Sequence, residues 1–450
     1  MARPVAKERP AYRCEACGLS VTKWVGQCPQ CQAWGTIGEV APARVRLEAG
    51  TVTSSARLIS DVDVEAARAR PTGVAELDRV LGGGLVPGAV VLLAGEPGVG
   101  KSTLLLEVAA RAAEQDAPTL YVTGEESAAQ VRLRAGRTGA LVPHLWLAAE
   151  TDLGAVVAHV DAVQPAMLVV DSIQTIASSQ VDGSAGGVTQ VRAVSAALIA
   201  LAKQRSIATV LVGHVTKDGS IAGPRLLEHL VDVVLAFDGE RHSTLRMVRA
   251  VKNRFGPADE VGCFILTDEG IVGLPDPSGL FLSRRSEPVA GSCVTVTVEG
   301  RRPIPAEVQA LVASTASPHP RRAVSGLDSA RVAMVLAVLD QRAKITISTK
   351  DVYTSTVGGV RLTEPSSDLA VALAIASAVR ELALPAETVV IGEVGLSGEV
   401  RPVPGVERRL GEAARLGFRR ALVPPGSGAA AAGIEVIEIG DVAAALKQLR

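Results

Sequence analysis

Short, almost entirely apolar runs alternate with longer amphipathic stretches between residues 58 and 273. A strand buried on both faces has such a run, and a helix between two runs supplies the crossover that parallel strands need. The clearest runs lie at 89–94, 119–123, 166–170 and 207–213. The pattern therefore predicts an α/β domain whose sheet is mostly parallel and flanked by helices.

The run at 89–94 ends in a glycine-rich loop, and a helical pattern begins directly after this loop. Glycines allow the backbone to wrap around a phosphate, while the N–H groups of the loop and of the helix N-terminus bind its negative charge. Lys101 is placed to reach the β- and γ-phosphates, and Ser102 to bind Mg²⁺. We therefore predict a site for ATP or GTP, which is made by Gly95, Glu96, Pro97, Gly98, Val99, Gly100, Lys101, Ser102 and Thr103.

Two further apolar runs end in acidic residues. The run at 119–123 is followed by Gly124, Glu125, Glu126 and Ser127, and the run at 166–170 ends at Asp171. Carboxylates at the carboxyl ends of parallel strands face the ligand crevice of such a sheet. Asp171 is predicted to hold Mg²⁺ through water, and one glutamate to orient or deprotonate the attacking water. A solvated helix start capped by Ser127 is an alternative for the glutamates, and both interpretations can hold together.

Two loops and one strand end carry further candidates. The loop 178–187 is rich in glycine, and the loop 215–225 follows His214 and contains Lys217 and Arg225. Partners bind at such loops, although plain connectors have the same composition, and a lone histidine is more often structural. A strand pattern at 245–256 ends in Lys252 and Arg254, which are either surface charges or groups that reach a neighbouring subunit's γ-phosphate.

Four of the six cysteines form two Cys-x-x-Cys pairs near the N-terminus. Two such pairs complete a tetrahedral Zn²⁺ site that has no open position for water, and disulfides are disfavoured in a reducing compartment. We expect Trp24 and Trp34 to pack around this module, and Cys263 and Cys293 to be buried as small hydrophobic residues. The predicted zinc ligands are Cys14, Cys17, Cys28 and Cys31.

The composition of the 450-residue chain narrows the function classes. The net charge is −1 and aromatic residues make up 2%, so binding of nucleic acid has to be local and depends little on stacking. No uncharged apolar run reaches the roughly 18 residues of a membrane span, and the N-terminus lacks a signal-peptide core, which predicts a cytoplasmic protein. The predicted parts are a zinc ribbon at 1–40, a linker at 41–57, an ATPase domain at 58–273, a linker at 274–287 and an α/β domain at 288–450.

Four of these features occur in the same order in the bacterial RadA/Sms family, which the chain resembles along nearly its whole length. They are the cysteine ribbon, the loop at 95–102, the strand end Gly-Glu-Glu-Ser at 124–127 and the motif Lys-Asn-Arg-Phe-Gly at 252–256. The last motif is the most diagnostic of the four. The resemblance implies a RecA-like ATPase that uses ATP, Mg²⁺ and Zn²⁺ and acts in DNA repair and recombination.

The resemblance also implies specific roles. RadA/Sms proteins are similar to DnaB-type helicases, which form hexameric rings that move on single-stranded DNA, and they promote branch migration. Glu125 would then be the water-activating base, and His214 would sense the phosphate state. Lys252 and Arg254 would act in trans on the neighbouring subunit's nucleotide. Lys217, Arg225 and the loops at 178–187 and 215–225 would face DNA, and the implied partners are single-stranded and branched DNA, the recombinase RecA and further copies of the chain.

The C-terminal domain resembles the proteolytic domain of Lon peptidases. In that family a serine before a helix is the nucleophile, and a lysine further along the chain activates it. Ser366 falls at the serine position, but Glu407 falls at the lysine position, and a carboxylate cannot replace the ammonium group. Arg408 and Arg409, the neighbouring candidates for that position, would not serve either, because arginine stays protonated. An inactive, Lon-like scaffold domain is therefore expected, and residues 365–368 are interpreted more simply as an N-cap of the following helix.

These observations predict a DNA-dependent ATPase motor that works as a ring, most simply a hexamer, in recombinational DNA repair. Two alternatives from other classes remain. One is an ATP-dependent peptidase of the Lon type, which Ser366 favours and Glu407 opposes. The other is a nucleotide-switched regulatory or scaffold protein, which the near-neutral charge and the scarcity of aromatic residues favour.

Overall fold

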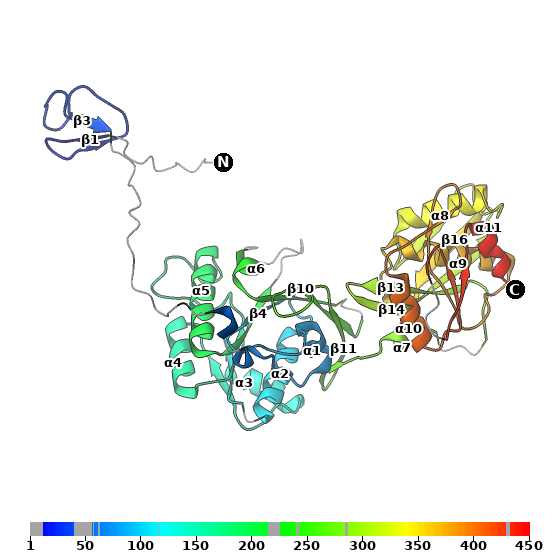
Figure 1. The fold of residues 1–450 in the computed structure, drawn as a ribbon, viewed down its shortest axis with the longest axis horizontal. Helices are drawn as coiled ribbons and strands as arrows, with labels where there is room; N and C mark the ends of the chain where they lie inside the picture. Colours follow the sequence, from blue (N-terminus) through cyan, green and yellow to red (C-terminus); the bar gives the residue numbers. More distant parts are fainter. Residues whose placement is uncertain are drawn as a thin grey trace. The chain divides into compact units, whose positions relative to one another are not determined.

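The computed structural model describes residues 12–39, 56, 58–61, 64–115, 117–214, 226–239, 243–283, 287–428 and 433–450. The chain divides into two compact units, residues 1–62 and residues 63–450 (Figure 1). Within the described ranges no helix is long and apolar enough to cross a membrane. The predicted cytoplasmic location stays a prediction.

The first unit contains a small metal-binding ribbon. Its strands β1 (Tyr12–Cys14), β2 (Ser20–Val21) and β3 (Ile37–Glu39) form an antiparallel sheet in the order β2-β1-β3, and a short 3₁₀ helix, η1 (Ile59–Asp61), lies further along the chain. The two tryptophans lie on the outside of this module, near Gly26. Trp24 and Trp34 are 62% and 75% exposed, because a core built on Cys14, Cys28 and Ile37 is too small to cover an indole ring.

A nine-stranded sheet forms the centre of the next part of the chain. Its strands run in the order β12-β11-β10-β9-β4-β8-β7-β5-β6, in which β4 to β9 are parallel and the last three along the chain are antiparallel. The sheet therefore confirms the mostly parallel architecture. The strands are β4 (Val90–Gly95), β5 (Thr119–Thr123), β6 (Leu145–Ala149), β7 (Met167–Asp171), β8 (Ala208–His214), β9 (Val233–Asp238), β10 (Leu245–Asn253), β11 (Val261–Thr267) and β12 (Gly270–Gly273).

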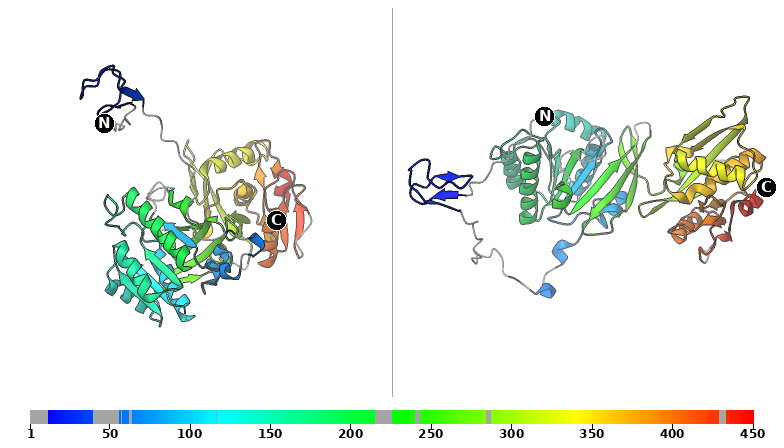
Figure 2. Two further views of the ribbon diagram at one scale, coloured as in Figure 1. Left: turned by 60° about the vertical axis from the view of Figure 1, so that its left-hand side comes forward. Right: turned by 90° about the horizontal axis from the view of Figure 1, so that it is seen from above.

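Helices cover both faces of this sheet (Figure 2). Neighbouring residues of a strand point to opposite faces, so Leu93 packs under α1, α2 and α3, while Leu92 packs under α4, α5 and α6. This explains why the strands are apolar along their whole length rather than alternating. The helices are η2 (Glu65–Ala67), α1 (Ala75–Leu81), α2 (Lys101–Glu114), α3 (Ala128–Arg137), α4 (Leu153–Val163), α5 (Val188–Arg205) and α6 (Leu226–Leu230).

The C-terminal part has its own seven-stranded mixed sheet in the order β15-β16-β14-β13-β17-β20-β21. The almost completely buried helix α9 lies on one face with α8 and α11, and α10 covers the other face. The strands are β13 (Ser292–Glu299), β14 (Arg302–Ser314), β15 (Arg322–Ser325), β16 (Lys350–Thr356), β17 (Thr388–Val390), β20 (Arg420–Val423) and β21 (Glu435–Glu438), with a separate pair of β18 (Glu393–Val394) and β19 (Val400–Arg401). The helices are α7 (Ser278–Phe281), α8 (Ser329–Gln341), η3 (Val357–Gly359), η4 (Pro365–Ser367), α9 (Asp368–Arg380), α10 (Val406–Arg415), α11 (Val442–Ala445) and η5 (Leu446–Gln448).

Buried residues mark where this C-terminal core begins. Phe281 of α7 is 1% exposed and belongs to the core under α9, so residues 278–281 pack with the C-terminal part. The predicted boundaries between the parts of the chain stay predictions.

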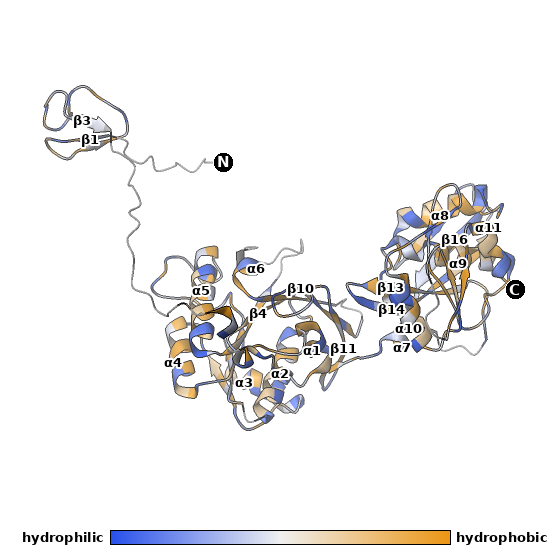
Figure 3. Cartoon of the chain, in the orientation of Figure 1, coloured by the Kyte–Doolittle hydropathy of each residue, from blue (hydrophilic) through white to orange (hydrophobic). Residues whose placement is uncertain are grey.

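Cys263 and Cys293 are buried as expected, and burial raises the pKa of both thiols. Figure 3 shows hydrophobic and hydrophilic residues interspersed along helices such as α4 and α5, as expected for helices that pack one side against a sheet.

Candidate nucleotide site and metal centre

The glycine-rich loop connects the end of β4 to the start of α2, as the pattern predicts. Gly98 and Gly100 have φ angles of +81° and +110°, which residues with a Cβ atom rarely adopt. The nearly buried Lys101 lies over the loop, and its Nζ donates hydrogen bonds of 2.8 Å to the carbonyl oxygens of Gly95 and Glu96. These two hydrogen bonds hold the ammonium group against the backbone at the start of the loop.

The loop has a support that the sequence did not reveal. Arg246 on β10 is 6% exposed, and its Nε donates a hydrogen bond of 2.9 Å to the carbonyl oxygen of Val99. β10 is two strands away from β4 in the sheet, so this contact depends on strand order rather than on sequence proximity. Because β10 also carries Arg249 and Lys252, its sequence does not single out Arg246.

Glu125 and His214 lie together beside Lys101. His214 Nε2 is 2.8 Å from Glu125 Oε1, and His214 Nδ1 is 3.4 Å from Lys101 Nζ. A third contact comes from Ser172, whose hydroxyl donates a 2.5 Å hydrogen bond to Glu125 Oε1. The structure therefore brings together three predicted site residues from three different strand ends, and adds Ser172.

Charge and burial act in opposite directions on the groups in this cluster. Burial alone would raise the pKa of Glu125, but the hydrogen bonds from Ser172 and His214 and the nearby Lys101 charge lower it below its usual value. Burial lowers the pKa of Lys101, and the carboxylates of Asp171 and Glu125 oppose this shift. Glu125 is consequently ionised at neutral pH, as an acceptor of a proton has to be.

The two neighbouring glutamates have different environments. Glu126 turns away from the cluster and pairs with Arg134 of α3. Ser127 caps α3 in a full capping box with Gln130. The helix-start interpretation is confirmed for Ser127, which caps α3. Glu125 faces the loop that carries Lys101, and its role toward the attacking water stays a prediction.

Asp171 is the last residue of β7, and His214 is the last residue of the neighbouring strand β8. The carboxylate is 5% exposed, and the hydroxyl of Tyr121 donates a 2.7 Å hydrogen bond to its Oδ2. A carboxylate and the Ser102 hydroxyl are oxygen ligands of the kind that Mg²⁺ prefers. These residues fit a magnesium site, and their assignment to it stays a prediction.

Lys252 and Arg254 lie at the opposite edge of the sheet. Lys252 Nζ donates two 2.7 Å hydrogen bonds to the carbonyl oxygens of Glu228 and Val231, and Arg254 pairs with Asp232 at 2.9 Å. The same Asp232 accepts a hydrogen bond from the N–H of Val90, the first residue of β4. Since β4 spans six residues, this edge is roughly 16 Å from the Lys101 loop at about 3.3 Å per residue.

The loops predicted to face DNA are only partly described. In the loop 178–187, the buried Gln190 accepts a hydrogen bond from the Ser178 N–H and donates to the carbonyl oxygens of Ser178, Val181 and Gly183. These four hydrogen bonds hold residues 178–183 in a defined conformation. Lys217 and Arg225 lie outside the described residues.

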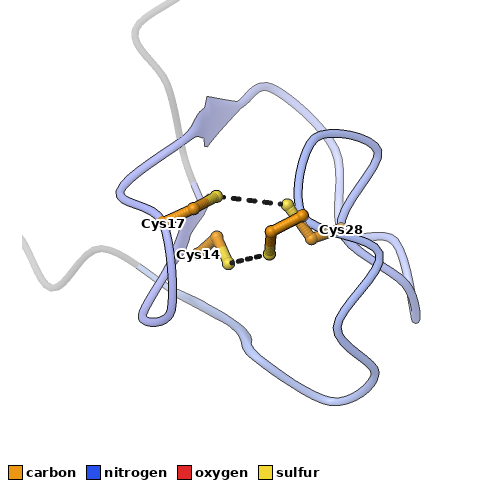
Figure 4. Close-up of side chains that lie close together, drawn as sticks. Cys14, Cys17 and Cys28 are labelled. Atoms are coloured by element: carbon orange, nitrogen blue, oxygen red, sulfur yellow. Dashed lines mark hydrogen bonds between the residues drawn. The ribbon is translucent and has the colours of Figure 1, made fainter.

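The four cysteines of the ribbon form a single cluster (Figure 4). Their sulfur atoms all lie within 4.8 Å of one another, with 3.7 Å between Cys14 and Cys31 and 3.5 Å between Cys17 and Cys28. Tetrahedral Zn–S bonds of about 2.3 Å require S···S distances of about 3.8 Å, so the cluster fits Zn²⁺. The hydroxyl of Thr36 contributes most to a lowered Cys14 pKa of about 6, which favours the thiolate that binds metal.

Removal of one zinc ligand gives a direct test. Cys28→Ser is expected to release about one Zn²⁺ per chain and to unfold the ribbon, because metal binding supplies most of the folding free energy of so small a module. Metal analysis of the purified variant measures this. Cys263→Ala, which removes a buried thiol elsewhere, is the matched control and should keep its zinc, whereas stoichiometric zinc in Cys28→Ser would contradict the assignment.

The C-terminal serine contacts one of the residues considered for the lysine position. Ser366 is 2% exposed, and its hydroxyl accepts a 3.0 Å hydrogen bond from Arg409, while Glu407 is exposed. Residues two apart on α10 differ by about 200° in direction, so Glu407 does not face the serine. Ser367 of the segment 365–368 is the N-cap residue of α9, but its hydroxyl donates to the Glu364 carbonyl oxygen and does not cap the helix. Arginine stays protonated and cannot act as the base that a peptidase serine needs.

The fold and the clustered side chains define a P-loop ATPase that carries a four-cysteine metal ribbon. Family models support this class: an AAA domain matches residues 54–220, a rubredoxin metal binding domain matches 12–39, and subunit ChlI of Mg-chelatase matches 341–427. The predicted fold class, with its zinc ribbon, ATPase core and C-terminal Lon-like α/β domain, is confirmed.

Comparison with curated proteins identifies the family. DNA repair protein RadA of Mycobacterium tuberculosis (strain CDC 1551 / Oshkosh) is 56% identical over 99% of this chain and 94% of that relative. The protein of the same name from Mycolicibacterium smegmatis is 56% identical over 99% and 98%, and that from Halalkalibacterium halodurans is 43% identical over 98% and 99%. This chain belongs to the RadA family of DNA repair proteins, as the motifs predicted.

Proposed function

We propose that this chain hydrolyses ATP in a Mg²⁺-dependent reaction and uses the energy to move on single-stranded DNA and to drive branch migration during recombinational repair. The observation that carries the proposal is the cluster of Lys101, His214 and Glu125 beside Asp171. Such a set can bind a triphosphate, activate water and report the phosphate state. The name shared by the relatives supports a role in DNA repair.

Each residue has a role in this proposal. The loop N–H groups and Lys101 bind the β- and γ-phosphates, and Ser102 and Asp171 hold Mg²⁺, which neutralises charge on the phosphates. Glu125 accepts a proton from the attacking water or orients it, and its lowered pKa keeps it ionised. His214, which contacts both Glu125 and Lys101, passes a change at the phosphate to the segment that follows β8.

The position of Lys252 and Arg254 supports the proposal of a ring oligomer. These cations lie at the sheet edge opposite the Lys101 loop, so they cannot reach a nucleotide bound to their own subunit. Arg254 is half exposed, which allows its guanidinium to leave Asp232 for a neighbour's γ-phosphate. We infer that each ATP site is completed in trans, in a closed ring that the resemblance makes a hexamer.

The proposed partners are single-stranded and branched DNA, the recombinase RecA and further copies of the chain in the cytoplasm. The ordered loop held by Gln190 lies after β7, at the carboxyl edge of the sheet that also carries the nucleotide cluster. A ligand at this edge is close enough to influence Glu125 through Ser172, which follows β7 directly. This arrangement supports coupling between a bound strand and hydrolysis.

Nucleotide hydrolysis with and without single-stranded DNA tests the function. We expect the purified chain to hydrolyse ATP slowly alone and at least several-fold faster with single-stranded DNA, with GTP run in parallel to determine base preference. Glu125→Gln, which keeps the shape of the side chain, should bind nucleotide without turnover. Absence of both DNA binding and DNA stimulation would contradict the motor and would favour a nucleotide-switched scaffold.

A further inference from the structure

Tyr121 is a buried aromatic residue on β5 whose hydroxyl reaches the neighbouring strand. β5 and β7 are adjacent and parallel, with Tyr121 opposite Val169 and Thr123 opposite Asp171. Side chains two residues apart on a strand share a face, so the Tyr121 ring and the Asp171 carboxylate lie on the same side of the sheet. The phenol donates its hydrogen bond of 2.7 Å to Asp171 Oδ2, and Tyr121 is 1% exposed.

The surroundings of the ring are mostly apolar, with the Glu126–Arg134 ion pair nearby. Tyr121 belongs to the core that α2 and α3 cover, and it lines an open pocket with Leu106, Val131 and Ala135. A phenylalanine would fill the same space, so packing alone does not require the hydroxyl.

A hydrogen bond to one oxygen restricts the rotation of a carboxylate. The hydrogen bond from Tyr121 holds Oδ2 of Asp171 in place. The carboxylate therefore cannot rotate freely, and its other oxygen points in a fixed direction relative to the sheet. Hydrogen bonds of this kind orient the ligands of protein-bound metals, and their loss typically weakens metal affinity or activity by about 10- to 100-fold.

We propose that Tyr121 is a positioning residue that orients Asp171 toward the magnesium ion of the bound nucleotide. This inference rests on the proposed function, because it takes Asp171 as the group that holds the metal, directly or through water. It adds a residue from a neighbouring strand to the site and predicts a specific defect: weaker use of Mg²⁺ with unchanged binding of the nucleotide itself.

Tyr121→Phe removes the hydroxyl and keeps the ring. We expect the Mg²⁺ concentration for half-maximal binding of a fluorescent ADP analogue to rise about tenfold. Binding of the same analogue in excess EDTA should be unchanged. Titration with Mn²⁺, followed by electron paramagnetic resonance on the nucleotide complex, should show the same loss, and this readout does not depend on turnover.

Leu120→Val is the matched control. Leu120 is adjacent on β5, is 1% exposed and faces the opposite side of the sheet, so the variant changes buried packing there without touching Asp171. Its metal dependence should equal that of the wild type. In an Asp171→Asn background, Tyr121→Phe should cause no further loss of metal affinity, because its effect passes through that carboxylate.

The outcomes separate this inference from the proposed function. If nucleotide binding by the wild type responds to Mg²⁺ but Tyr121→Phe shows the same response, the positioning role is overturned while the ATPase proposal stands. If nucleotide binding and hydrolysis by the wild type are both independent of divalent metal, the assignment of Asp171 itself is overturned. A tenfold shift in Tyr121→Phe that is absent in Leu120→Val supports the proposal.

Discussion

Lys101→Ala is expected to lower nucleotide turnover by about 10²- to 10³-fold or more, because it removes a preorganised positive charge from the reacting phosphates. Arg254→Ala should cause a comparable loss, since a cation supplied in trans is worth about 10³-fold or more. The two variants should differ in binding. Arg254→Ala should keep nucleotide affinity, while Lys101→Ala, which also loses the ammonium group held over the loop, should bind weakly.

Mixing the two inactive variants gives the decisive measurement. In a mixed ring, an interface formed by the loop of an Arg254→Ala subunit and the arginine of a Lys101→Ala subunit is complete. Random assembly makes about a quarter of all interfaces complete, so an equimolar mixture should recover up to about that share of wild-type turnover. The matched control is the double variant mixed with a single variant, which forms no complete interface. Equal inactivity of the two mixtures would contradict the composite site.

Arg409→Leu is expected to destabilise the C-terminal part by about 3–5 kcal/mol, the usual cost of removing one partner from a buried ion pair. Arg409 is 1% exposed and donates to both oxygens of Glu364, to the Ser366 hydroxyl and to the Val296 carbonyl oxygen. Its loss leaves a carboxylate without a countercharge and other acceptors without a donor. Denaturant unfolding, followed at the C-terminal part, measures the change.

Arg408→Leu is the matched control for that variant. Arg408 is the neighbouring residue on α10, is exposed and makes one long contact of 3.4 Å to a carbonyl oxygen. Its replacement should change stability by less than about 0.5 kcal/mol. If Arg409→Leu costs no more than this control, the buried pair does not stabilise the domain. Replacing both Arg409 and Glu364 by leucine should recover part of the loss.

The same pair should make stability depend on acid pH. Burial alone would raise the pKa of Glu364, but the hydrogen bonds from Arg409 and Thr297 and the Arg409 charge lower it to about 2. Because the unfolded value is about 4.3, the carboxylate stabilises the fold fully above that pH, and the contribution disappears as the pH falls toward 2. Glu364→Gln should therefore show a flatter decline of its thermal midpoint between these values than the wild type.

Local patterns were sufficient to predict the elements that carry the nucleotide site. Continuous apolar runs predicted β4, β5, β7 and β8, and the observed strands begin and end within a residue or two of those runs. The glycine-rich loop, Asp171 and Glu125 all follow these strands directly. Because parallel strands present their carboxyl ends at one edge, adjacency in sequence to a strand end was enough to place these residues together.

Contacts between strands could not be predicted in the same way. The hydrogen bonds of Tyr121 to Asp171, Ser172 to Glu125 and Arg246 to Val99 each depend on strand order and on the direction of a side chain. The choice among Glu407, Arg408 and Arg409 depends on structure for the same reason, because counting along a motif does not determine which face of a helix meets the serine. The exposure of Trp24 and Trp34 has another cause, because the ribbon is too small to bury large side chains.

By itself, the sequence determined that this protein is a zinc-ribbon ATPase of the RadA family, because short motifs with local backbone requirements define each of those features. Only the tertiary structure decided which groups act together. In the structure, His214 and Glu125 lie beside Lys101, and Arg254 lies at the opposite edge of the sheet. At the Lon-like serine, the buried Arg409 donates a hydrogen bond to Ser366. The reason is physical: motifs fix local geometry, whereas strand order and burial determine which distant charges meet.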